Sequence, residues 1–197
     1  MAKPNKFILA SASPRRAELL HAAGLDFHVR VSPTPEPTRR PNWIPITTWP
    51  ALLALIKAQS VLALYPGQPV VVIGADTIVE LDGEILGKPR HCSDARRMLT
   101  RLSGHQHQVH TGVAIVTPHG QETLLATSVC YLKKLTPRQL KAYLDSGLWH
   151  GKAGAYGIQD ETTEPWVRLR RGSWSNVVGL PMEALRPRLQ TYANAGC

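Results

Sequence analysis

The chain has 197 residues, a length typical of one domain or two small ones. Its 23 Lys and Arg residues against 14 Asp and Glu give a formal net charge of +9, and 43% of the residues are hydrophobic. This composition supports a folded core and excludes a disordered chain. The basic balance favours an anionic partner, whether nucleic acid, a membrane surface or a phosphorylated small molecule.

Apolar runs are too short for a transmembrane helix, because none reaches about 18 residues. Only a very short apolar stretch precedes Arg15 and Arg16, whereas a signal peptide needs a longer one, so we expect a cytoplasmic protein. Cys92, Cys130 and Cys197 form no CxxC pair. Their spacing favours reduced thiols over a disulfide framework or a zinc knuckle.

The first third of the chain alternates short strands and helices around a proline-rich segment. Ser13 suits a helix N-cap and Pro14 the first helical position, while Gly24 suits the end of that helix. Six prolines between residues 33 and 50 exclude regular structure there. The predicted elements are a strand over 7–10, a helix from Pro14 to Gly24, a strand over 27–31, a surface loop over 33–50 and a helix capped by Thr48 that runs to about Leu64.

The middle of the chain begins with a continuous β-branched run over 70–73, which is typical of a strand buried on both faces. This strand is expected to end in the segment 74–77. A hairpin follows, with residues 78–81 and 84–86 as its strands and Asp82-Gly83 as its turn.

The remaining elements alternate helices with longer strands. In chain order they are a helix capped by Ser93 and closed by Gly104, strands over 107–116 and 123–133, a helix opened by Thr136-Pro137, short strands near Val167 and Val177, and a last helix after Pro181. No internal repeat or low-complexity linker occurs. The order of elements predicts an α/β or α+β protein around one mixed sheet.

A first candidate site lies where the first strand leads into the first helix. The helix N-terminus leaves free backbone N–H groups at the positive end of its dipole, which suits an anion. Ser11 and Ser13 add hydroxyl groups, and Arg15 and Arg16 add forked donors that match phosphate oxygens. The alternative is that Ser13 only caps the helix and that the arginines are solvated.

Asp76 and Lys88 are two further candidates. Asp76 is expected just beyond a buried strand, where open α/β sheets bind ligands, and its carboxylate could hold Mg²⁺ or accept a proton from water. Lys88, between Gly87 and Pro89, could reach a phosphate. The alternatives are an aspartate that shapes a turn and an exposed turn lysine.

Three other groups of residues favour structural roles. His105 and His107 share one face of a strand and His110 lies on the other, with no Cys or carboxylate nearby at ligand spacing, so a metal site is disfavoured. The glycine-rich segment 151–159 is expected to bring its backbone close to a nucleobase or to another strand. The basic pairs favour solvated faces over a nucleic-acid surface because no aromatic residues are interleaved with them; they are Arg39-Arg40, Arg96-Arg97 and Arg170-Arg171.

Six segments, in order and over nearly the whole chain, resemble the Maf family of nucleoside triphosphate pyrophosphatases. They are ASASPRRAELL (10–20), LIKA (55–58), GADTIVELDGEILGKP (74–89), LSGHQHQVHTGV (102–113), GKAGAYGIQ (151–159) and GSWSNVVGLP (172–181). The resemblance implies a single domain over residues 1–197 with an inosine-triphosphate-pyrophosphatase-like fold. That fold is a curved mixed sheet with flanking helices and a cleft between two lobes.

The resemblance also implies a reaction and a set of site residues. A nucleoside triphosphate is hydrolysed between its α and β phosphates to the monophosphate and pyrophosphate, with Mg²⁺ or Mn²⁺ assisting. Asp76 falls on the presumed proton acceptor, and Glu36 and Asp76 on positions that can share the metal. Phosphate-binding positions are matched by Ser11, Arg15, Arg16, Lys57 and Lys88, and specificity positions by Arg15, Thr77 and Gln159.

The segments AYGIQ and SNVVGLP are most similar to the branch that acts on dTTP and UTP, which suggests a house-cleaning enzyme for these and for modified pyrimidine nucleotides. Two positions depart from the family: Pro35 stands where a second carboxylate often precedes Glu36, and Gly151 where an aspartate is common. The family suggests a homodimer, with no specific nucleic acid and no membrane as partner. The alternative is a nucleotide-binding regulator of septum formation with little turnover.

Overall fold

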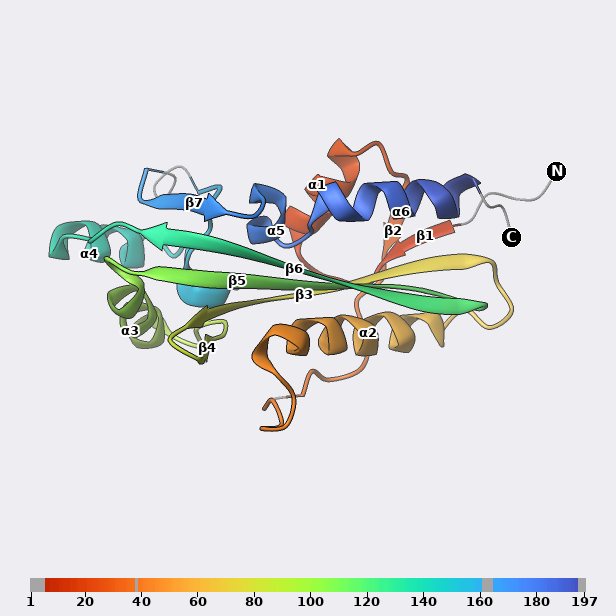
Figure 1. Cartoon of the computed structure of the whole chain (residues 1–197), viewed down its shortest axis with the longest axis horizontal. Helices are drawn as coiled ribbons and strands as arrows, with labels where there is room; N and C mark the ends of the chain where they lie inside the picture. The colour runs from red at the N-terminus through yellow and green to blue at the C-terminus, as the bar shows by residue number, and fades with distance from the viewer. Residues whose placement is uncertain (1–5, 38, 161–164, 195–197) are drawn as a thin grey trace. The chain divides into compact units, whose positions relative to one another are not determined.

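A computed structural model describes residues 6–37, 39–160 and 165–194 (Figure 1). The chain divides into two compact units, each described here by itself: the first comprises Met1–Asp76, Thr111–Ala126 and Gly179–Cys197, and the second Thr77–His110 and Thr127–Val178. The strands are β1 (Lys6–Leu9), β2 (Phe27–Val29), β3 (Val70–Leu81), β4 (Glu84–Leu86), β5 (Gln106–Thr117), β6 (Gly120–Leu132) and β7 (Val167–Arg171). The helices are α1 (Pro14–Ala22), α2 (Trp49–Leu62), α3 (Cys92–Leu102), α4 (Pro137–Asp145), α5 (Trp174–Val178) and α6 (Met182–Asn194), with short 3₁₀ turns at Ile46–Thr48 and Ala153–Ala155.

The strands form one mixed sheet, as the sequence predicts. Their order is β2-β1-β3-β5-β6-β7, and β4 pairs with β3 outside this path. β1 runs parallel to β2 and β3, whereas β4 is antiparallel to β3 and β7 is antiparallel to β6. In the described part of the chain, no helix has the combination of length and apolarity that crossing a membrane requires.

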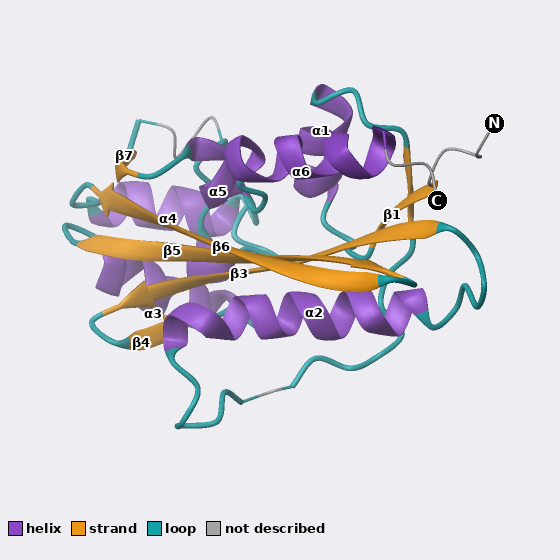
Figure 2. Ribbon diagram, turned by 45° about the vertical axis from the view of Figure 1, so that its right-hand side comes forward, coloured by secondary structure: helices purple, strands orange, loops and turns teal. Residues whose placement is uncertain are grey.

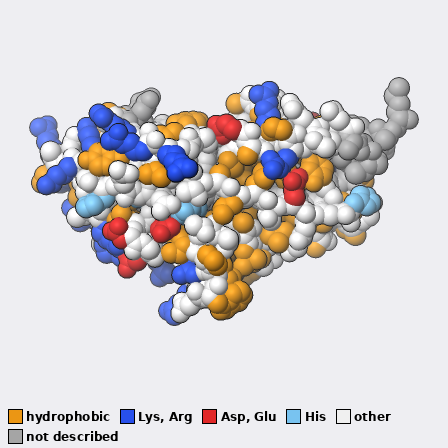
Figure 3. Space-filling view, viewed as in Figure 1, with side chains coloured by type: hydrophobic (Ala, Val, Ile, Leu, Met, Phe, Trp, Pro, Cys, Tyr) orange, Lys and Arg blue, Asp and Glu red, His pale blue; other side chains and the backbone are white. Residues whose placement is uncertain are grey.

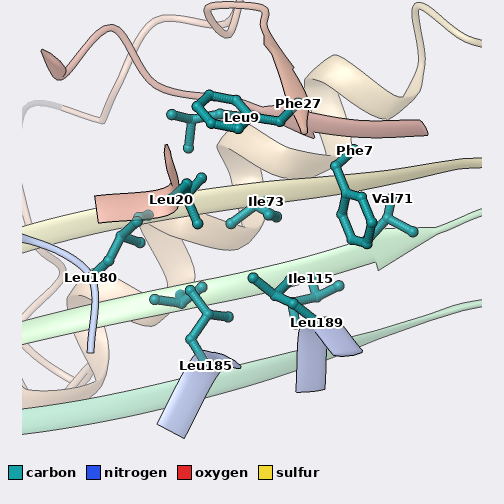
Figure 4. Close-up of a cluster of buried hydrophobic side chains, with 12 residues drawn as sticks. Phe7, Leu9, Leu20, Phe27, Val71, Ile73, Ile115, Leu180, Leu185 and Leu189 are labelled. Carbon is teal, nitrogen blue, oxygen red and sulfur yellow. The ribbon is translucent and has the colours of Figure 1, made fainter. Parts of the chain in front are cut away.

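The first unit buries both faces of its strands, which confirms the interpretation of the β-branched run in β3. On one face, α1 and α6 pack with side chains such as Phe7, Ile73 and Leu185 (Figure 4). On the other face, Ala54 and Ala58 of α2 pack with alternate side chains of β1, β3 and β5. Figure 2 shows α2 and the pair α1 and α6 on opposite sides of these strands. Since burial is two-sided, polar groups in this part of the sheet lie among apolar neighbours.

The expectation that the buried strand ends in the segment 74–77 is wrong, because β3 continues through this segment to Leu81. A Cβ atom on Gly74 would lie 2.1 Å from the carbonyl oxygen of Ala54, so the glycine lets α2 approach the sheet rather than ending the strand. Gly112 on β5 does the same, because its Cβ would lie 2.1 Å from the backbone nitrogen of Ala51. β3 therefore continues through Asp76, which is a residue inside a strand and not one beyond it.

The second unit confirms two turn predictions. Asp82 and Gly83 have φ values of 51° and 79°, as a type I′ hairpin turn requires, and they join β3 to β4. Thr136 opens α4 through a capping box with Gln139. The glycine-rich segment approaches another strand, since a Cβ atom on Gly154 would lie 3.0 Å from a methyl group of Val79.

Two predicted elements of the second unit are wrong. The N-cap of α3 is His91, not Ser93, because the His91 side chain accepts a hydrogen bond from the backbone of Asp94. Val177 lies in the short helix α5 rather than in a strand. There Asn176 donates from Nδ2 to the Val109 carbonyl and to Ser128, and these long-range bonds favour a turn of helix over an extended segment.

Candidate active site

Three charged side chains of the first unit form the centre of the candidate site. The Nζ of Lys57 lies 2.6 Å from Oδ1 of Asp76 and 2.9 Å from Oε1 of Glu36. Lys57 and Asp76 are buried, whereas half of the Glu36 side chain is exposed. No other described residue donates a hydrogen bond to Oδ2 of Asp76. One oxygen of this carboxylate is therefore neutralised while the other is left for a ligand.

Packing of α2 on β3 brings Lys57 to Asp76. Gly74 and Asp76 are two residues apart on β3 and share a face, which is the face that α2 covers. Because Gly74 admits the backbone of Ala54, the following turn of α2 lies close enough for the Lys57 side chain to reach the carboxylate. Gly74, inside β3, thus helps to position the candidate site.

Arg16 connects α1 to the same end of β3. Its Nη1 donates to Oγ of Ser11 and to the carbonyl of Ala75, each at 2.9 Å, and its Nε donates to the carbonyl of Gly179 at 3.0 Å. Burial lowers the pKa of Arg16 from its ordinary value, and the nearby Asp76 charge opposes this change. Arg16 therefore lies near the Asp76 carboxylate, and two of its nitrogen atoms already donate hydrogen bonds within the protein.

The beginning of α1 retains the features of an anion site. Ser13 is at the predicted N-cap, but its side chain accepts no capping hydrogen bond from the first turn. Instead, Oγ of Ser11 accepts from the backbone N–H of Ser13 at 3.3 Å. Arg15 is half-buried and has no hydrogen bond or ion pair with another described residue. The first turn and the Arg15 guanidinium are therefore available to an anion.

The two carboxylates fit a divalent cation. Glu36 and Asp76 direct oxygens at a single point, which the Lys57 ammonium takes. Mg²⁺ and Mn²⁺ prefer carboxylate oxygens and complete their coordination with water and substrate phosphates. No group of three or more His, Cys, Asp or Glu residues within the described ranges forms a metal cluster, so any such ion would need ligands from a substrate or solvent.

The other predicted site residues belong to the second unit. Thr77 directly follows Asp76 on β3, and Lys88 is exposed after β4 without an ion pair to any described residue. The side-chain oxygen Oε1 of Gln159 is buried, and no described residue donates a hydrogen bond to it. A buried amide oxygen of this kind is costly unless a ligand or water supplies a donor.

The histidines of β5 have structural contacts, as expected. His107 shares a 2.6 Å hydrogen bond with the Tyr156 hydroxyl, and burial lowers the pKa of His107 to about 4. His110 lies on the opposite face and contacts Glu80 and Thr127. Burial raises the pKa of the Cys130 thiol to about 11, so Cys130 is not a reactive thiolate at neutral pH.

A buried ion pair beside Gln159 was missed by the sequence interpretation. Lys152 donates to Oδ2 of Asp160, both side chains are about nine-tenths buried, and Tyr143 donates to the same oxygen at 3.1 Å. Asp160 directly follows Gln159, so this ion pair fixes the chain on which Gln159 is presented. The only signal in the sequence is a lysine and an aspartate eight residues apart in a glycine-rich segment.

Comparison with known proteins identifies the family. A family model described as Maf-like protein matches residues 6–192, and the chain belongs to this family. It is 42% identical over 178 residues to the dTTP/UTP pyrophosphatase of Vibrio vulnificus (strain YJ016), covering 90% of this chain and 94% of the relative. It is 44% identical over 183 residues to that of Symbiobacterium thermophilum, covering 90% and 89% of the two chains. The corresponding protein of Moorella thermoacetica is 44% identical over 191 residues, with 95% of each chain covered.

Among solved structures, the Ham1 protein of Staphylococcus aureus aligns with a TM-score of 0.46 and 14% identity, covering 65% of this chain and 72% of that one. This similarity is too low to identify the fold, so the inosine-triphosphate-pyrophosphatase-like fold stays a prediction. The mixed sheet with flanking helices is observed directly.

Proposed function

We propose that this protein hydrolyses nucleoside triphosphates, with dTTP, UTP and modified pyrimidine nucleotides as substrates, to the monophosphate and pyrophosphate. Relatives named dTTP/UTP pyrophosphatase match nine-tenths of the chain. The observation that carries the proposal is the state of Asp76: Oδ1 is bound by Lys57, and Oδ2 lacks a described donor. A buried carboxylate with one oxygen that accepts no hydrogen bond from a described residue can accept a proton from water.

In the proposed reaction, water attacks the α phosphorus and Asp76 takes its proton at Oδ2. The bond from the α phosphorus to the bridging oxygen breaks, and pyrophosphate leaves with the electron pair. Lys57 and Arg16 orient the carboxylate and hold positive charge beside it. The first turn of α1, with Ser11 and Arg15, binds phosphate oxygens, and Lys88 is proposed to contribute another cation. Positioning and charge neutralisation provide most of the rate in reactions of this type.

A divalent cation, Mg²⁺ or Mn²⁺, is part of the proposal, and Asp76 and Glu36 would hold it. When bound, it would offset negative charge on the triphosphate and on the leaving pyrophosphate. Lys57 would then share the two carboxylates with the cation or turn toward the substrate. Pro35 leaves this chain with one carboxylate at residues 35–36, so substrate phosphates and water would supply the remaining ligands.

Gln159 provides a chemical basis for choosing the base. Uracil and thymine carry an N–H donor at position 3 of the ring, whereas cytosine has an acceptor there. The buried Oε1 of Gln159 needs a donor, which the first two bases can supply. Arg15 and Thr77 are proposed as the other specificity residues, on the resemblance of the segments that contain them.

A homodimer completes the proposal, and it rests on the resemblance to the family. Light scattering during size-exclusion chromatography would measure the mass in solution and compare it with the 21.7 kDa of one chain.

Asp76→Asn tests the proposed function. We expect this variant to retain its fold and to lose about 10²–10⁴-fold in kcat, because an amide cannot accept the proton from water. Pyrophosphate release would be measured with dTTP, UTP, CTP, 7-methyl-GTP, ITP and the common purine triphosphates, each with Mg²⁺ or Mn²⁺. Asp145→Asn is the matched control, since Asp145 is an exposed carboxylate whose one ion pair among the described residues is with Lys141.

Normal turnover by Asp76→Asn would overturn the assigned mechanism. Release from purine triphosphates alone would keep the reaction and reject the pyrimidine assignment. Tight nucleotide binding without product from the unaltered protein would favour the regulator instead, and Pro35 and Gly151 would then be the first positions to change.

A further inference from the structure

The second unit carries positive charge that its described acidic residues do not balance. The stretch 133–144 contains four basic residues and the stretch 165–178 contains three, and neither contains an acidic residue. Lys141 pairs with Asp145, but the other six have no ion pair with a described residue: Lys133, Lys134, Arg138, Arg168, Arg170 and Arg171. Figure 3 shows Lys and Arg side chains gathered over the region of α4 and β7.

Aromatic side chains lie among these cations. Tyr131 on β6 pairs directly with Arg168 on β7, and the guanidinium of Arg170 lies 5.3 Å from the centre of the Tyr131 ring. The backbone N–H of Lys133 donates to the carbonyl of Trp166, which continues the same pairing. Sequence reasoning missed this interleaving because Tyr131 comes from the neighbouring strand, far from the arginines along the chain.

An apolar pocket opens beside Trp166. It has a volume of about 270 Å³ and is lined by Arg138, Gln139 and Ala142 of α4, by Tyr143 and by Trp166. The rings of Tyr143 and Trp166 meet edge to face, with centroids 5.9 Å apart. Its volume is near the lower end, about 300 Å³, for small-molecule sites, which suits one planar ring. Arg138 supplies a cation to the lining of the pocket.

We propose that this basic–aromatic surface, formed by the six unpaired cations with Tyr131 and Trp166, binds single-stranded nucleic acid without sequence preference. Phosphates would contact the arginines and lysines, and one base would enter the pocket at Trp166. Alternating charge and flat rings match a polymer of phosphates and exposed bases, whereas a duplex keeps its bases stacked inside. None of these residues belongs to the candidate active site.

Two other occupants fit the surface less well. A second copy of the chain could pair with β7, which ends the strand order, but antiparallel pairing would bring Arg168 and Arg170 against like charges. An anionic membrane would use the charges and leave the recessed pocket beside Trp166 without a ligand.

The test uses fluorescence anisotropy of a labelled (dA)₂₀ strand, which avoids pyrimidine bases, in EDTA without nucleotide. We expect Arg168→Gln/Arg170→Gln to weaken binding at least tenfold at about 50 mM salt and to reduce the slope of log K against log salt by about 1.4, or 0.7 for each lost phosphate contact. The control Arg96→Gln/Arg186→Gln removes the same charge from exposed positions elsewhere and should leave both quantities unchanged.

Trp166→Leu, at constant charge, should weaken binding about fivefold or more because one stacked base is lost. Tyr131→Leu gives the same readout if thermal melting shows that the Trp166 variant does not fold. The proposal would be overturned if the two double arginine variants lost affinity equally, or if both aromatic variants bound the strand as tightly as the unaltered protein. Equal or tighter binding of a duplex, of heparin or of phosphatidylserine vesicles would also overturn it.

Discussion

Lys57 is the central residue of the candidate site, because its ammonium lies within ion-pair distance of both Asp76 and Glu36. Its ammonium takes the position that a divalent cation would take. Because one side chain takes this position, replacing Lys57 tests the proposed metal site without a measurement of turnover.

We predict that Lys57→Met lowers the free energy of unfolding by about 3 kcal/mol, since Asp76 is left buried and unpaired. Mn²⁺ should then raise the melting temperature of this variant more than that of the unaltered protein, because the two carboxylates become free to bind it. Differential scanning fluorimetry with and without Mn²⁺ measures both effects. In the exposed pair of Lys141 and Asp145, Lys141→Met should cost no more than about 1 kcal/mol and show no response to Mn²⁺. Equal shifts in the two variants would contradict the cation site.

Residue patterns predicted part of this site and left part to the fold. Ser11, Arg16 and Asp76 follow from their place next to predicted strands and a helix start. Lys57 and Glu36 have no local signal, because their contacts depend on how α2 and the proline-rich loop pack. Only the family resemblance indicated them, and the structure brings Lys57 to both Asp76 and Glu36.

Among the elements of the first unit, α2 packs directly against the backbone of the sheet. Small residues at the contact make this close approach possible. Ala51 and Ala54 face Gly112 and Gly74, so backbone meets backbone. The spacing of these alanines along α2 is the signal that could have shown Gly74 to be a packing residue. The sequence alone predicts a strand end in the segment 74–77, because the helix that packs against Gly74 lies in another element.

We predict that Gly74→Ala destabilises the first unit by about 1–3 kcal/mol, because the new methyl group would overlap the carbonyl of Ala54. Displacement of α2 should also move Lys57 and lower activity. Urea unfolding and steady-state kinetics measure the two effects. Gly120→Ala is the control, since a Cβ there meets nothing within 4 Å. A Gly74→Ala protein of unchanged stability would show that the helix can shift freely.

At the scale of the whole molecule, His107 links stability to pH. Its folded pKa is about 4, below the ordinary 6.5, because burial disfavours the charged ring. The unfolded chain therefore binds the proton more readily between pH 4 and 6.5, and stability falls as the pH is lowered through this range.

We expect His107 to account for a loss of about 2 kcal/mol between pH 7 and pH 5. His107→Gln keeps a group that can form a hydrogen bond with Tyr156. Urea unfolding at pH 5, 6 and 7 should show that the stability of this variant depends less steeply on pH. The exposed His119 gives the control, because His119→Gln should leave the dependence unchanged. An identical slope in the His107 variant would mean that the buried ring does not titrate in this range.

The core of the first unit joins the two ends of the chain. Phe7 and Leu9 pack in one cluster with Leu180, Leu185 and Leu189 (Figure 4). During synthesis the ribosome releases β1 long before it releases α6, so this core stays open until nearly all of the chain has emerged. A polypeptide that stops before Gly179 would keep its strands but expose the apolar side that α6 covers. Premature termination therefore yields a substrate for chaperones and proteases rather than a shortened enzyme.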